Sequence, residues 1–282
     1  MKKRNFWRLF GAAALACLVF LNTSTISAEE DAQKPSGAEV PVSETAAPAP
    51  KPTAEPNRPA RLEALADRLA FGADRVEKVW LGKDGAQHLA LFQPPATADA
   101  HGAVIVILAS GKILERSEFS QTVRRTLADG DWASLVVQSE QMTAGKALPL
   151  DAAQVSNLFA EALAYAQQQS YSKFVLVADG EIASHLWPVV QTENQALMGF
   201  VGIDAWDVED FEPKIPVLNV ANTVVPGAVT SARKRFNRVK RAPSAACEVY
   251  FYDGNLISDT GFGQLISRRI RGWLKRKFVD AS

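Results

Sequence analysis

Hydrophobic and polar positions follow two different patterns along this chain, and together these patterns predict its strands and helices. From about residue 103 onward, short uninterrupted runs rich in Val, Ile and Leu recur at intervals. Apolar runs without alternation are typical of strands covered on both faces, as in a parallel sheet. We expect six such strands, at residues 103–108, 133–137, 174–177, 198–201, 217–220 and 248–251.

Between these strands, apolar residues recur every three or four positions, which is the periodicity of helices. Helices are expected at residues 119–127, 152–169, 182–190, 229–239 and 262–278. In the second, Asp151 stands where an N-cap is needed, and an apolar stripe runs from Val155 to Ala166. Strands that alternate with helices indicate right-handed crossovers and one doubly wound sheet.

A different pattern precedes the parallel strands. Residues 61–71 have the spacing of a short helix. Two apolar runs, 76–81 and 88–92, are then separated by Gly82-Lys83-Asp84-Gly85, which is typical of a hairpin turn. The predicted fold class is therefore α/β, a doubly wound and mostly parallel sheet with an N-terminal antiparallel hairpin, formed by residues 60–282.

The first 28 residues have the composition of a secretory signal peptide. A basic start at residues 1–4 precedes an apolar run at 10–21, and the small residue Ala28 precedes two glutamates. The run is shorter than the ~20 residues of a spanning helix. We expect cleavage after Ala28 and a periplasmic location; the alternative is an uncleaved membrane anchor formed by residues 6–21.

Residues 29–59 are rich in Ala, Pro, Glu and Lys and contain no aromatic residue. Such a segment buries too little apolar surface to offset the entropy of ordering, so we expect a disordered linker. Its prolines favour an extended spacer.

Charge is distributed unevenly along the chain. Without the four cations of the signal, 27 Lys and Arg and 31 Asp and Glu remain, a net charge of −4. Residues 231–282 nevertheless carry 12 cations and 4 acids. An exported, net acidic chain argues against nucleic acid as a partner. Cys247, the single cysteine of the mature chain, excludes a disulfide framework and opens an apolar strand, which favours a buried, inert thiol.

The central stretch, residues 174–184, predicts a buried strand, a sharp turn and the start of a helix. In α/β-hydrolases this junction reads Gly-x-Ser-x-Gly and carries the nucleophile. Here the window is Ala178-Asp179-Gly180-Glu181-Ile182, so Gly180 occupies the nucleophile position between Asp179 and Glu181. Glycine tolerates the left-handed backbone of such a turn, and we interpret the stretch as a degenerate elbow without a reactive side chain.

A hairpin followed by six parallel strands matches the number and order of strands in the α/β-hydrolase fold, with the turn at Gly180 after the fifth strand. From about residue 76 to 278, the chain resembles a family of exported bacterial α/β-hydrolase-like proteins of unknown function. The resemblance rests on Gln93-Pro94-Pro95 after the hairpin and on the basic Gly272-Trp273-Leu274-Lys275 helix. It implies Gly-His-Gly at the central turn, from which Ala178-Asp179-Gly180 departs.

The other catalytic positions of that fold lack the expected residue types. The mature chain has three histidines, His88, His101 and His185, and none follows the last strand, where the base would lie. After the seventh strand, where an acid would orient that base, the chain has Asn219 and Asn222. Asp204 follows the sixth strand, and we interpret it as a turn or capping aspartate.

One weak alternative constellation remains. Ser110 precedes Gly111 in the loop after the first parallel strand, where hydrolases form the oxyanion hole. With His185 and Asp204, Ser110 defines a rearranged catalytic set. The histidines are scattered and no Cys-x-x-Cys or His-x-x-x-His spacing occurs, so we expect neither a metal nor a cofactor.

The last helix has an apolar side and a strongly basic side. Its cations are Arg268, Arg269, Arg271, Lys275, Arg276 and Lys277. A second cluster precedes it, formed by Arg233, Lys234, Arg235, Arg238, Lys240 and Arg241. Solvated cations on a docked helix are one interpretation; contact with an anionic envelope component or a membrane surface is the other.

Two hypotheses follow. The vacancies at the nucleophile, acid and histidine positions favour an exported, non-catalytic α/β-hydrolase-like protein that binds a ligand or partner in the cell envelope. The alternative is an envelope esterase-type hydrolase that uses the rearranged residues.

Overall fold

The computed structural model describes residues 76–83, 87–109, 114, 117–141, 150–191, 196–205, 211–239, 247–254 and 262–280. Every described residue belongs to one compact unit, Thr53–Ser282. The predicted signal peptide, the linker and the helix at 61–71 lie outside the described residues.

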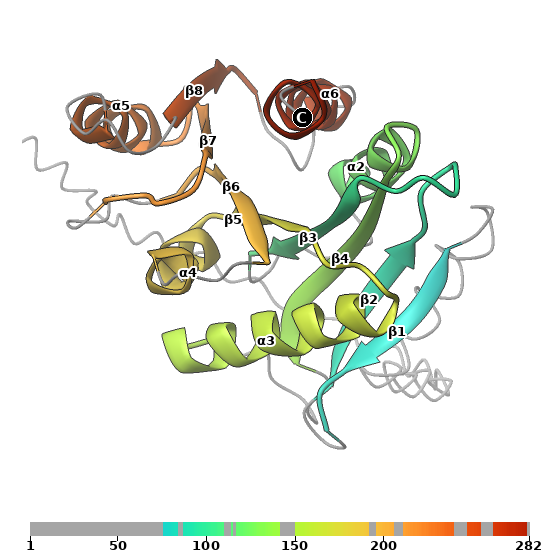
Figure 1. Ribbon diagram of the computed structural model, residues 1–282. Coiled ribbons are helices and arrows are strands. Elements are labelled where there is room, and N and C mark those ends of the chain that lie inside the picture. Colours follow the sequence, from blue (N-terminus) through green and yellow to red (C-terminus); the bar gives the residue numbers. More distant parts are fainter. Residues whose placement is uncertain are drawn as a thin grey trace, which may run out of the picture. The chain divides into compact units, whose positions relative to one another are not determined.

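Eight strands form one sheet in the order β1-β2-β4-β3-β5-β6-β7-β8 (Figure 1). β1 pairs antiparallel with β2, β2 pairs antiparallel with β4, and all other neighbours are parallel. This confirms the predicted hairpin and the six parallel strands. The strands are β1 Glu77–Leu81, β2 His88–Gln93, β3 Gly102–Leu108, β4 Trp132–Gln141, β5 Phe174–Asp179, β6 Leu197–Ile203, β7 Val217–Asn222 and β8 Cys247–Tyr252.

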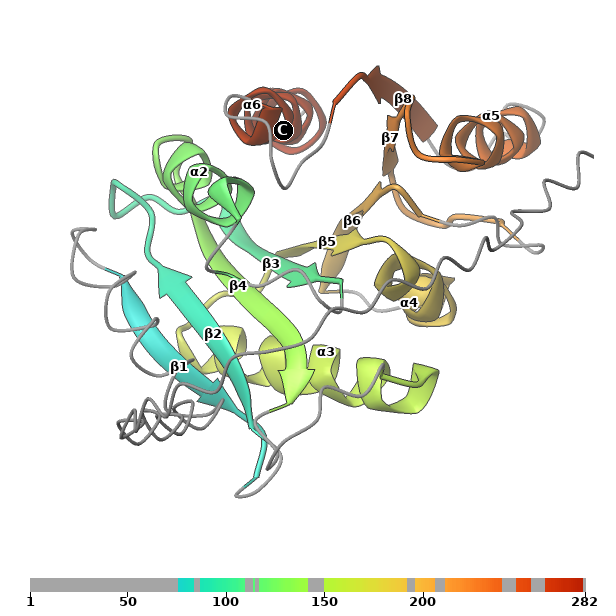
Figure 2. The same cartoon turned by 180° about the vertical axis from the view of Figure 1, so that it is seen from behind.

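Helices cover both faces of this sheet (Figures 1 and 2). One apolar core joins α3 and α4 to the sheet, and a second core joins α2 and α6 to the opposite face. Every residue of β3 and of β5 is buried between them, which explains their uninterrupted apolar sequence. The helices are α2 Glu118–Ala128, α3 Ala152–Gln168, α4 Glu181–Gln191, α5 Ala228–Val239 and α6 Phe262–Leu274.

The start of α3 confirms the cap predicted at Asp151. The Asp151 carboxylate accepts a hydrogen bond from the Gln154 backbone N–H at 2.8 Å, and the Gln154 side chain accepts one from the Asp151 N–H at 2.9 Å. This capping box satisfies two backbone donors that the first turn leaves without helical partners.

The last predicted helix, 262–278, is not a continuous α-helix. After Leu274 the backbone widens into a π-helix, η1 Lys275–Val279, in which the Asp280 N–H donates to the Lys275 carbonyl. The wider turn brings Phe278 over Trp273, with ring centroids 5.4 Å apart, and against Trp132 at 6.3 Å. Gly199 of β6 makes room for them, because a Cβ there would lie 2.7 Å from the Phe278 ring.

Two further properties of the described residues bear on membrane spanning and on metal binding. None of the helices in this part of the chain has the length and apolar character needed to span a bilayer. Within the same residues, no three His, Cys, Asp or Glu side chains gather as metal ligands do.

His88 is a buried ionisable group in β2, and it makes folding sensitive to pH. Its Nδ1 lies 3.3 Å from the Gln138 carbonyl oxygen. Burial lowers the pKa of His88 below 6.5, although hydrogen bonds to the Gln138 and Ser139 backbone act in the opposite direction. As pH falls through 6.5, the unfolded chain takes up a proton at this position before the folded chain does, so stability declines.

We expect the free energy of unfolding to fall more steeply between pH 7.5 and pH 5.5 in the wild type than in His88→Gln. Urea unfolding at both pH values measures this difference. His101→Gln is the control, because it keeps His88 and should keep the wild-type dependence. An equal decline in the wild type and in His88→Gln would contradict the assignment.

Candidate functional site

The turn between β5 and α4 has the geometry of an elbow but carries no side chain. Gly180 has a φ of 56°, in the left-handed region. Its N–H donates to the Ile203 carbonyl at 2.7 Å, which fixes the turn against the end of β6. Among the described residues, a Cβ at Gly180 would meet only the Ala109 Cβ, at 3.5 Å, which is an ordinary van der Waals contact. Within this part of the chain, steric crowding therefore does not explain the absence of a side chain.

Next to this turn, three polar residues join the carboxyl ends of β6, β7 and β8; we name Asp204, Asn222 and Tyr252 the strand-end cluster. One oxygen of the Asp204 carboxylate accepts from the Asn222 backbone N–H at 2.6 Å. The other accepts from the Tyr252 hydroxyl at 2.8 Å. The Asp204 N–H itself donates to the Val220 carbonyl at 2.8 Å.

The Asn222 side chain also forms hydrogen bonds within the fold. Its amide nitrogen donates to the Gly254 carbonyl, and its oxygen accepts from the Val224 N–H at 3.1 Å. At the position where the hydrolase fold places its acid, this residue therefore holds the loop that follows β8.

Tyr252 stays protonated in this cluster. Burial raises the pKa of its phenol, and the Asp204 and Asp179 carboxylates raise it further because they disfavour a phenolate. Tyr252 can therefore donate a hydrogen bond at neutral pH, but it cannot act as a base.

Two of the three weak catalytic candidates, Asp204 and His185, lie within the described residues. Asp204 has a φ of 50°, a conformation in which Asp and Asn are enriched, and its carboxylate bonds β7 and β8 as a capping group would. His185 is half-buried in α4. Ser110 lies outside the described residues.

The degenerate elbow has a buried acid on one side and a half-buried acid on the other. Asp179, the last residue of β5, is only 3% exposed, and its charge contributes to the raised pKa of Tyr252. Glu181 is half-buried in the first turn of α4, where a carboxylate complements the helix dipole. The elbow thus combines carboxylates with a missing nucleophile.

Arg235 behaves differently from the basic cluster to which the sequence pattern assigned it. It is 2% exposed, and it donates to the Asn219 side chain at 2.8 Å and to the Ala205 carbonyl at 3.0 Å. Its helical spacing from Ala228, Ala232 and Val239, which are all buried, is the signal that could have identified it. Arg235 therefore ties α5 to the sheet rather than contributing to an exposed basic surface.

Asn219 connects this arginine to the cysteine. Its amide nitrogen lies 3.2 Å from the Cys247 sulfur. Burial raises the pKa of the Cys247 thiol to about 11, against smaller lowering effects of Asn219 and Arg235. At neutral pH almost no thiolate forms, so the geometry favours an unreactive thiol.

The six cations of the last helix do not form one uniform surface. Arg276 and Lys277 each lie 3.1 Å from the Glu248 carboxylate, and Arg269 lies over the Tyr250 ring at 4.8 Å. Arg271 packs its stem against Gly130. The side chains of Arg268, Arg269, Arg271, Lys275 and Arg276 are exposed, which keeps an anion contact sterically open.

Solved structures share this architecture. Dienelactone hydrolase from Anabaena variabilis matches with a TM-score of 0.58 and 13% identity, covering 72% of this chain and 98% of that one. Est1E from Butyrivibrio proteoclasticus gives a TM-score of 0.54 and 11% identity, covering 71% and 98%. An esterase domain from Rhodothermus marinus gives 0.54 and 12%, covering 72% and 99%. The fold is therefore that of the α/β-hydrolases.

The sequence family is narrower than this fold. Residues 12–156 match the family described as "Protein of unknown function (DUF3530)", which is half of the chain. The chain belongs to this family. A comparison with curated proteins gives no match.

Tyr252→Phe tests whether the strand-end cluster stabilises the fold. The substitution keeps the ring but leaves one Asp204 oxygen without the hydroxyl that it accepts from. We expect a loss of about 1.5–3 kcal/mol in the free energy of unfolding, measured in urea, because hydrogen bonds to charged groups are worth that much.

Tyr250→Phe is the matched control, since Tyr250 lies half-buried on the same strand and keeps its ring beneath Arg269. It should change stability by less than about 0.5 kcal/mol. Equal effects of the two substitutions would show that the hydroxyl of Tyr252 has no structural role.

Proposed function

We propose that this protein is a non-catalytic member of the α/β-hydrolase fold that is exported and binds a ligand or partner in the cell envelope. The observation that carries the proposal is the elbow at Gly180. The left-handed turn is present, its N–H is bonded to Ile203, and the residue that would attack a carbonyl has no side chain.

The strand-end cluster adds independent support. A Ser-His-acid relay needs a carboxylate that accepts from an imidazole. Both Asp204 oxygens instead accept from β7 and β8, and Asn222 bonds its own loop. The sequence after β8 contains no histidine. All three roles of the relay thus lack the group that would perform them in the usual order.

The N-terminal sequence supports export to the periplasm. A basic start, an apolar run and Ala28 before two glutamates are typical of a cleaved signal peptide. In the periplasm, the ligands and partners within reach are components of the cell envelope.

Activity assays test the non-catalytic part of the proposal. The wild type should show no turnover of short-chain p-nitrophenyl esters above buffer and no labelling by a serine-directed fluorophosphonate. An active serine esterase provides the positive control. Turnover that Ser110→Ala abolishes would overturn the proposal in favour of the esterase-type alternative.

Gly180→Ser sharpens the same test. It places a hydroxyl at the elbow, and Gly180→Ala is the matched control that adds the Cβ without the hydroxyl. Both should lose about 1–2 kcal/mol of stability, because a side chain in the left-handed region costs that much. Both should remain inactive, since a serine without a base is a poor nucleophile. Ester turnover by Gly180→Ser alone would show that a base is in place.

Export is tested separately. N-terminal sequencing of the protein from a periplasmic fraction should give Glu29 as the first residue. Ala28→Phe should block cleavage, because the cut requires a small residue, while Ala14→Leu in the apolar run should not. A membrane-bound chain that retains its first residues would instead support an anchor at residues 6–21.

A further inference from the structure

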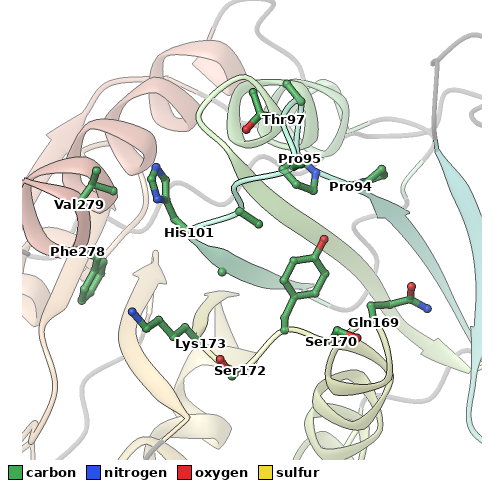
Figure 3. Close-up of a pocket in the computed structure, with 15 residues that line it drawn as sticks. Pro94, Pro95, Thr97, His101, Gln169, Ser170, Ser172, Lys173, Phe278 and Val279 are labelled. Atoms are coloured by element: carbon green, nitrogen blue, oxygen red, sulfur yellow. The ribbon is translucent and has the colours of Figure 1, made fainter.

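A large groove lies at the amino-terminal ends of the parallel strands (Figure 3), whereas the elbow lies at their carboxyl-terminal ends. Its volume is about 1110 Å³. It is formed by the loop at residues 94–102, by residues 169–173 before β5, and by the end of η1. Because β5 begins immediately after Lys173 and ends at Asp179, the full length of the strand separates this groove from Gly180.

Specific contacts hold the groove's rim in place. Thr97 donates through its hydroxyl to the Asp131 carboxylate at 2.7 Å. The Ala96 and His101 backbone N–H groups donate to the Ala128 and Asp131 carbonyls at 3.0 and 2.9 Å. These bonds attach the loop to the turn between α2 and β4, so the groove is formed before any ligand binds.

Two residues at the rim adopt left-handed backbone conformations without being glycine. Asp131 has a φ of 61° and Ser170 a φ of 68°. Such conformations cost of order 1 kcal/mol or more each and often occur at ligand sites. Each follows the end of a helix, α2 or α3, and Ser170 lines the groove while Asp131 bonds Thr97 in its rim.

One end of the groove is cationic. Figure 3 shows the amino group of Lys173 and the His101 ring on the side of Phe278 and Val279. Among the described residues, no aspartate or glutamate lines the groove itself, and Asp131 lies behind Thr97 in its rim. A smaller hollow of about 250 Å³ shares His101 and Val279 and adds the cations Arg271 and Lys275 beside two aspartates. Across the part of the chain that the structure describes, Lys173 forms no ion pair.

The other end offers an aromatic ring and neutral hydrogen-bonding groups. Gln169 and Ser170 lie there (Figure 3), and Tyr171 follows them along the chain and also lines the groove. The Tyr171 ring is held against Phe92, with centroids 6.4 Å apart. Burial raises the pKa of its phenol, so the hydroxyl is a neutral donor.

The backbone of the rim excludes one common mode of peptide binding. Peptides often add a strand to a sheet by bonding free backbone groups. Here the N–H groups of Ala96, His101 and Ala103 are already bonded to carbonyls of the fold. These three N–H groups are therefore not available to a ligand, and the side chains of the groove offer a flat ring, hydroxyls, an amide and an ammonium.

We propose that the groove binds an anionic oligosaccharide whose sugar rings carry carboxylates, such as a chain of uronic acid units. The apolar face of one sugar ring packs on Tyr171, its hydroxyls bond Gln169 and Ser170, and a carboxylate bonds Lys173. Small-molecule sites usually measure roughly 300–1,000 Å³, so the volume of this groove accommodates more than one sugar unit. Binding in this groove does not depend on whether the turn at Gly180 is catalytic.

Isothermal titration of the purified protein with tetragalacturonate tests the proposal. Maltotetraose, a neutral tetrasaccharide, and tetraglutamate, a peptide of the same charge, serve as comparison ligands. We expect tetragalacturonate to bind at least about tenfold more tightly than either, because both a ring and a charge are recognised.

Two substitutions locate the binding. Lys173→Gln should weaken the affinity for tetragalacturonate about tenfold and leave maltotetraose unaffected, because it removes only the ammonium. Tyr171→Leu should weaken both sugars. Lys83→Gln is the matched control, since Lys83 is an exposed lysine in the β1–β2 turn, outside the groove.

The fold should survive the main substitution, because Lys173 is exposed and supports β3 only through its carbonyl, which accepts from Ala103 at 2.9 Å. Thermal melting checks this. The proposal is overturned by absent binding at millimolar tetragalacturonate, by binding that Lys173→Gln leaves unchanged, or by tetraglutamate binding as tightly. None of these outcomes bears on the esterase assays, so failure of this proposal and of the non-catalytic proposal are distinguishable.

Discussion

The carboxyl ends of β6, β7 and β8 depend on the hydrogen bonds that the Asp204 carboxylate accepts. Asp204 follows β6, accepts from the backbone of β7 and accepts from the Tyr252 side chain of β8. The ends of parallel strands leave backbone groups unpaired, and an unpaired buried donor is costly. One acid therefore satisfies donors from two neighbouring strands. Asp204 thus has a structural role at this end of the sheet, and residues 253–282 contain no histidine that it could orient.

The elbow is tied to the same cluster through β6. The Gly180 N–H bonds the carbonyl of Ile203, the residue immediately before Asp204. The shape of the turn is thus imposed by pairing with the end of the sheet, whether or not a nucleophile is present. Glycine adopts this left-handed turn without the strain that a serine would carry. This explains how an elbow persists as a structural junction between β5 and α4.

Features that depend on local pattern could be predicted from the sequence, and features that depend on distant contacts could not. The strands, the cap at Asp151 and the turn at Gly180 follow from periodicity and residue type. The π-helix does not, because its cause is packing of Phe278 on Trp132 and beside Gly199, which are far away in the sequence. The charge of Arg235 indicates an exposed cation, whereas its helical spacing from the buried Ala232 and Val239 indicates the burial that the structure shows. The groove combines residues near 97, 171 and 278, which only the fold brings together.

The carboxyl-terminal and amino-terminal ends of the parallel strands differ in how their polar groups are used. At the carboxyl-terminal ends, the side chains of Asp204, Asn222 and Tyr252 are bonded to one another or to backbone. At the amino-terminal ends, the N–H groups of Ala96, His101 and Ala103 are bonded within the fold, whereas the residues Lys173 and Tyr171 line a groove. Recognition of a ligand needs polar groups that the fold itself does not use, because each bond to a ligand otherwise replaces one that stabilises the protein. By that criterion, among the residues that the structure describes, the groove at the amino-terminal ends of the strands offers polar side chains to a ligand, whereas the strand-end cluster uses its own within the fold.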